Sequence, residues 1–78
     1  MVLQILNIEV KSIKLSEVKE CMAKKMPVIH QNIEYKYISA CIMRLIDGDW
    51  KYSLELMETN RYGVVTASLE KVEVEKDG

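Results

Sequence analysis

Apolar and polar residues alternate along most of the chain after Pro27, which is the pattern of half-buried β-strands. Asn tolerates positive φ, so Gln31-Asn32 is a good tight turn, and "TNRYG" reads as another. Small side chains at Ser39 and Ala40 would let one long strand bend there. We expect short strands at 27–30 and 64–67, a long or bent strand at 33–46, strands at 50–58 and 72–75, and one helical turn at 68–71.

In the stretch "LSEVKECMAKKMP" the apolar residues recur at steps of three and four, which predicts one short helix over residues 15–26. Ser16 is the expected N-cap, because its hydroxyl can accept from free amides of the first turn. Pro27 ends the helix. A helix of three turns is unstable alone in water, so it must pack on the sheet. Its apolar stripe would consist of Leu15, Val18, Met22 and Met26.

Residues 2–10, "VLQILNIEV", are rich in aliphatic side chains and predict a strand, which could also pair with a second copy of the chain. Gln4 and Asn7 interrupt the apolar run, and no basic region precedes it. It therefore fits neither a signal peptide nor a membrane span. We expect a cytoplasmic protein with no membrane partner.

Asp47-Gly48 lies between two apolar strands and predicts a hairpin, because a type I′ turn needs positive φ at both central positions. With a two-residue loop, Leu45 opposes Trp50 and Ser39 opposes Leu56, and one face is almost wholly apolar. Arg44 then opposes Lys51, which is mildly unfavourable. A three-residue loop would avoid this contact, and it would exchange the two faces of the first strand, so that Ile46 opposes Trp50 and Ala40 opposes Leu56. In both registers the side chains sharing one face are Trp50, Tyr52, Leu54 and Leu56.

Composition places the chain among small globular domains. It has 78 residues, of which 49% are hydrophobic and 29% charged, and its net charge is −1. Nucleic-acid-binding proteins usually carry a basic excess, which is absent here. The spacing of Cys21 and Cys41 fits no metal motif, and a small secreted domain usually has more cysteines. We expect both thiols to be reduced and buried.

No pattern in the sequence indicates catalysis. Asp47-Gly48-Asp49 lacks the further oxygen ligands and the closing glutamate of a calcium loop. His30 precedes a turn and is expected on the surface with no catalytic partner. Phosphate-binding loops, nucleophile elbows and zinc spacings are also missing. We predict no enzyme activity, no cofactor and no metal site.

Alternating aromatic residues suggest a binding surface. Tyr35 and Tyr37 are two positions apart, as are Trp50 and Tyr52, so each pair would share a face. These rings either complete a thin core or form an exposed groove for a peptide or single-stranded nucleic acid. The candidate binding residues are Tyr35, Lys36, Tyr37, Arg44, Trp50, Lys51, Arg61 and Tyr62. The last strand would be a solvated edge strand with Val72 and Val74 facing inward.

The strand order from Pro27 resembles an SH3-like small barrel. The segment "MPVIHQNIEYKYISACIMRLIDGDWKYSLELME" also resembles small uncharacterised proteins of Gram-positive bacteria and their phages. That resemblance rests on structural motifs and implies no activity. The N-terminal strand and helix are additions to a minimal barrel. The predicted fold is one mostly β domain over residues 1–78, an SH3-like barrel or strongly curled antiparallel sheet of five to six strands with one short helix.

The composition and the motifs favour a non-catalytic adaptor or accessory module that binds a protein or peptide. One alternative is a nucleic-acid-binding accessory factor of a phage or mobile element. Another is a self-assembling domain that dimerises through residues 2–10. The position of the basic side chains relative to the rings would separate these hypotheses.

Overall fold

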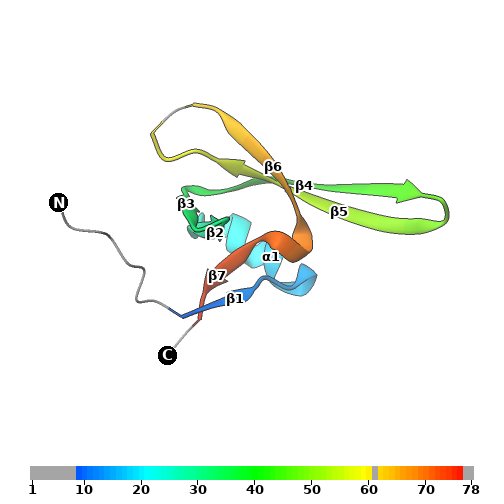
Figure 1. Ribbon diagram of the computed structural model, residues 1–78, viewed down its shortest axis with the longest axis horizontal. Helices are drawn as coiled ribbons and strands as arrows, with labels where there is room; N and C mark the ends of the chain where they lie inside the picture. Colours follow the sequence, from blue (N-terminus) through cyan, green and yellow to red (C-terminus); the bar gives the residue numbers. More distant parts are fainter. Residues whose placement is uncertain (1–8, 61, 77–78) are drawn as a thin grey trace.

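The computed structural model describes residues 9–60 and 62–76, which form two antiparallel sheets and one α-helix (Figure 1). One sheet has the strand order β1-β7-β2-β3 and the other the order β4-β5-β6. The elements are β1 (Val10–Ser12), α1 (Leu15–Ala23), β2 (Val28–His30), β3 (Ile33–Tyr35), β4 (Tyr37–Ile46), β5 (Asp49–Met57), β6 (Val64–Ser68), the 3-10 turn η1 (Leu69–Lys71) and β7 (Glu73–Glu75).

The mostly β prediction with one short helix is confirmed, whereas a closed barrel is not. Seven strands are found in the described ranges, in two sheets, where we expected five or six in one. The C-terminal strand is not an edge strand, contrary to prediction, because β7 pairs with both β1 and β2. Val72 and Val74 face inward as expected. Of the predicted strand 2–10, residues 2–8 lie outside the described part, and Val10 pairs with Glu75.

The long stretch 33–46 is broken at Lys36, where the chain passes from one sheet to the other. The Lys36 N–H donates to the carbonyl oxygen of Met57 at 2.8 Å. A bulge follows at Ser39, since Ile38 pairs with Leu56 and Ala40 with Glu55. The expected pairing of Ser39 with Leu56 is therefore wrong. The extra residue shifts the alternation by one, so that Ile38 and Cys41 can both face the core.

The β4–β5 hairpin has the two-residue register. Leu45 pairs with Trp50 and Arg44 with Lys51, as the first of the two registers required. Asp47 has φ 50° and Gly48 has φ 82°, the positive values that a type I′ turn needs. The unfavourable approach of two cations is tolerated because both side chains are exposed to water, which screens their repulsion.

The turn gives a first testable prediction. Gly48→Ala should lower the free energy of unfolding by about 1 kcal/mol, because a Cβ is strained at this φ. No heavy atom lies within 4 Å of that Cβ, so a clash would not add to the effect. Asp47→Gly is the control in the same turn and should cost far less, since glycine accepts positive φ freely. Urea unfolding of both variants is the measurement, and equal losses would contradict the turn assignment.

Helix α1 begins two residues earlier than an N-cap at Ser16 would place it. Its N-cap is Lys14, not Ser16, which lies inside the helix. The Glu17 carboxylate accepts from the Lys14 N–H at 2.9 Å and forms an ion pair with Lys11 at 2.8 Å. The hydrogen bond from Lys11 and the one from the Lys14 backbone lower the pKa of Glu17 below its ordinary value of 4.5. The stabilisation of this helix end is therefore present above that value and fades as Glu17 protonates in acid.

The core lies between the two sheets and α1. The helix packs on β4 and buries Val18 and Cys21. Leu15 and Met26 of the expected stripe remain exposed. Contrary to prediction, His30 is buried, and its Nδ1 lies 3.0 Å from the carbonyl oxygen of Lys71. The buried cluster comprises Ile13, Val18, Cys21, Val28, Tyr35, Ile38, Leu54, Leu56, Ala67, Val72 and Val74.

Candidate protein-contact surface

The far end of the β4–β5 hairpin extends beyond the rest of the chain (Figure 1). Every residue from 43 to 51 is exposed. The strand β6 pairs with β5 only from Ser53 to Met57, so it stops short of this end. We call residues 43–51 the arm.

One side of the arm is apolar. Met43, Leu45 and Trp50 are 57%, 58% and 55% exposed, and the strand pairing places them on the same side. We call these three side chains the apolar face of the arm. The same side of the sheet, followed toward the body, carries the fully buried Leu54 and the half-buried Cys41. The apolar face is therefore the core side of the sheet, continued past the point where the core ends.

The opposite side of the arm is mixed. It carries the pair Arg44 and Lys51 and the pair Ile46 and Asp49. Alternation along a strand puts these side chains on the other surface from Trp50. Arg44 is thus kept away from the exposed ring, whereas Lys51 lines one hollow with Trp50 beside η1.

The other candidate residues from the sequence do not gather at the arm. Tyr35 is buried, with its ring centroid 6.5 Å from that of His30. Tyr37 is half-buried, and the Nζ of Lys25 lies 5.7 Å from its ring centroid. Lys36 and Tyr62 are exposed, and Arg61 lies outside the described residues. Among the seven predicted residues that the structure describes, Arg44, Trp50 and Lys51 lie together on the arm, and Lys36 and Tyr62 line a separate small pocket.

The sequence prediction did not include Met43 and Leu45, although their faces were assigned correctly. We expected the apolar side of the hairpin to belong to the core. The length of the two predicted strands, compared with the length of the one predicted helix, could have indicated that Met43 and Leu45 are exposed. The paired strands reach well beyond the part of the sheet that one nine-residue helix can cover.

A hollow of about 490 Å³ lies where α1 meets the apolar side of β4. Cys41 is the β4 residue at its wall. The remaining wall comes from α1 and is mainly apolar, with Leu15, Ser16, Val18, Lys19 and Met22. The hollow and the apolar face of the arm therefore meet on one surface, since Cys41 lies two residues before Met43 on the same side of the strand.

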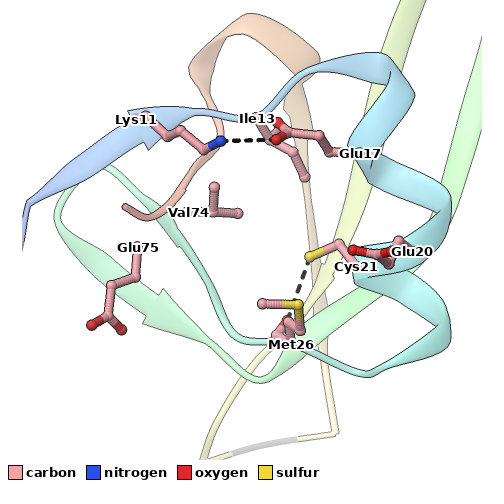
Figure 2. Close-up of a pocket in the computed structure, with 8 residues that line it drawn as sticks. All are labelled: Lys11, Ile13, Glu17, Glu20, Cys21, Met26, Val74 and Glu75. Carbon is pink, nitrogen blue, oxygen red and sulfur yellow. Dashed lines mark hydrogen bonds and ion pairs between the residues drawn. The ribbon is translucent and has the colours of Figure 1, made fainter. Parts of the chain in front are cut away.

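A smaller pocket of about 120 Å³ opens between α1, β1 and β7 (Figure 2). Glu17, Glu20 and Glu75 line it together with Cys21, whose Sγ lies 3.9 Å from the carbonyl oxygen of Met26. Burial raises the pKa of the Cys21 thiol, and the charges of Glu17 and Glu20 raise it further. A reactive cysteine needs the opposite surroundings, so Cys21 does not have the environment of an activated nucleophile.

The two cysteines should differ in reactivity. Cys21 is buried and its thiolate is disfavoured, whereas Cys41 is half-buried at the wall of the hollow. In highly diluted protein, where each chain is single, we expect a thiol reagent at neutral pH to label Cys41 at least about tenfold faster than Cys21, because only the thiolate reacts. Mass spectrometry of peptides from briefly labelled protein measures both rates. Equal rates in the folded protein would contradict the burial of Cys21.

In the described ranges, no three His, Cys, Asp or Glu side chains gather as a metal site would require. No helix there is long and apolar enough to cross a membrane. The chain matches no protein-family model, and comparison with curated proteins and with solved structures gives no significant match.

Proposed function

We propose that this protein is a non-catalytic adaptor or accessory module that binds another protein through the apolar face of its arm. The observation that carries this proposal is the position of Met43, Leu45 and Trp50, which are all more than half exposed on one side of one hairpin. A contiguous apolar patch at the surface commonly marks a protein contact, and Trp and Met are frequent at the centres of such contacts. We place the protein in the cytoplasm, in keeping with its free cysteines.

The arrangement favours a protein partner over nucleic acid. A single-stranded nucleic acid needs exposed rings beside basic side chains, so that bases stack while phosphates are neutralised. Here Arg44 lies on the side of the arm away from Trp50, and the hollow that Trp50 shares with Lys51 is also lined by the carboxylate of Glu70. The tip carries Asp47 and Asp49, whose charges repel phosphate. The resemblance to small barrel proteins of bacteria and phages stays a prediction and adds no partner.

Site-specific photo-cross-linking tests the proposal. A photoreactive phenylalanine analogue at Leu45 reports on the apolar face, and the same analogue at Lys51 reports on the opposite side of the same arm. In cells that express the full chain, we expect protein adducts from position 45 and few from position 51. Adducts to nucleic acid, or no position-dependent protein adduct at all, would overturn the proposed function.

A further inference from the structure

The outer edge of β4 is open. In the sheet β4-β5-β6, the strand β4 pairs on one side only, and no other strand of the described ranges covers its free side. An open edge presents unpaired main-chain N–H and C=O groups, and stable monomers usually guard it with lysines, proline or short length. Past the bulge, residues 40–46 of β4 contain one charge, Arg44, and no proline. The other edge strands, β1, β3 and β6, are only three to five residues long.

The turn determines which groups face outward. In a type I′ turn the first residue accepts from the fourth, so Ile46 and Asp49 form a hydrogen-bonded pair. Hydrogen-bonded and non-bonded pairs alternate along an antiparallel ladder. The N–H and C=O groups of Ile46, Arg44 and Ile42 therefore point toward β5. Those that point to the open side belong to Cys41, Met43 and Leu45.

We propose that the partner of this surface is a second copy of the same chain, paired antiparallel through β4 about a two-fold axis at Met43. This inference rests on the proposed function, because it names the protein that the arm contacts. Cys41 then lies opposite Leu45 of the other copy, and Met43 opposite the other Met43. All three outward-facing residues enter hydrogen-bonded pairs, each of which exchanges both main-chain bonds. The two sheets become one continuous sheet.

This register also fills the hollow beside α1. Directly opposed residues in an antiparallel pair point to the same face of the sheet. The side chain of Leu45 from one copy therefore lies next to Cys41 of the other, at the wall of the hollow that α1 lines with Leu15, Val18 and Met22. The projecting leucine and the apolar hollow that would receive it are both present on one chain. In a two-fold pairing, Leu45 of each copy enters the hollow of the other copy, so that the same two surfaces meet twice, as an isologous interface requires.

Charge and area are compatible with this pairing. Arg44 lies opposite Ile42 of the other copy, so no like charges meet across the axis. The net charge of −1 gives little repulsion between copies. The exposed apolar side chains of the arm present on the order of 400 Å² per copy. With the paired backbones, the interface approaches roughly 1,000 Å² in total, which is the least area expected of a specific interface and is typical of weak association.

Disulfide trapping in the full chain tests the register. Leu45→Cys places a new thiol opposite the native Cys41 of the other copy, at a Cα separation of about 5.5 Å, which a disulfide spans. The two positions are too far apart within one strand to bridge. With oxidised glutathione as the oxidant, we expect most of this variant to run as a covalent dimer on a non-reducing gel. Ile46→Cys, its neighbour on the opposite side of the strand, should give at least about tenfold less.

A second variant covers the case in which loss of the leucine weakens association. Cys41→Ala with Met43→Cys keeps Leu45 and places two thiols on the axis, where they should also bridge. Failure of both variants, or equal trapping with Ile46→Cys, overturns the inference. The photo-cross-linking then separates the two proposals. Adducts to a different protein at position 45 would leave the proposed function standing, and no protein adducts would remove both.

Discussion

Leu54→Ala should lower the free energy of unfolding by about 3 kcal/mol, whereas Leu45→Ala should lower it by less than about 0.5 kcal/mol. Both leucines lie on the same side of the same hairpin. Leu54 is 0% exposed and touches the core, while Leu45 is 58% exposed on the arm. Truncating the first leaves a cavity that the surrounding side chains fill only in part. Truncating the second removes surface that water already reaches in the single chain.

Urea unfolding at a concentration low enough to keep the chains apart measures this difference. A domain of 78 residues has only a few kcal/mol to lose, so Leu54→Ala is expected to unfold near physiological temperature. Leu56→Ala should behave in the same way, because Leu56 is also 0% exposed. If Leu45→Ala and Leu54→Ala cost the same at low concentration, then the arm is packed against the body and its apolar face is not free.

Met43→Pro should weaken association of the chain by about 30-fold or more while leaving each copy folded. The N–H of Met43 points to the open side of β4, so proline there removes no bond to β5. In the proposed dimer the same change removes a hydrogen bond on each side of the axis and places a ring between the strands. Two lost bonds of about 1 kcal/mol each give that factor.

Met43→Thr is the matched control for this effect. It truncates the same side chain, but it keeps the N–H and favours a strand. We expect it to associate far more strongly than Met43→Pro. Sedimentation over a range of concentrations gives both dissociation constants, and circular dichroism confirms that each variant is folded. Equal weakening by the two substitutions would mean that the side chain, rather than the edge backbone, holds the copies together.

Much of the hairpin could be predicted from the sequence, because local rules determine it. Asp47-Gly48 specifies a type I′ turn, and the turn specifies the register through to Cys41 and Leu54. The small residues Ser39 and Ala40 predict a bend in the long strand, but they do not predict that it takes the form of a bulge at Ser39. It has no glycine or proline to mark it, and it follows from the need to turn both Ile38 and Cys41 toward one core.

The errors elsewhere come from contacts distant in sequence. His30 looked like a surface residue because Gln31 and Asn32 follow it, but β7 and η1 return to cover it. Strand β7 looked like an edge because its charges alternate, yet β1 pairs with its outer side. The face of Leu45 was predicted but its exposure was not, and for Trp50 the sequence left a core position and an exposed groove both open. Alternation gives the side of a sheet to which a residue points, and only the tertiary fold determines how far the core extends along it.

The central claim is that the apolar face of the arm is a contact surface between proteins and that β4 pairs with a second copy. The solution mass of the full chain tests this claim most directly. Light scattering on a size-exclusion column should give twice the 9.0 kDa of one chain at micromolar concentration. Leu45→Asp should give one chain, and Arg44→Asp, on the opposite side of the arm, should remain close to two. A mass of one chain for the unaltered protein at every concentration would contradict the pairing of β4 with a second copy, and a dimer that Leu45→Asp leaves intact would contradict the part given to the apolar face of the arm.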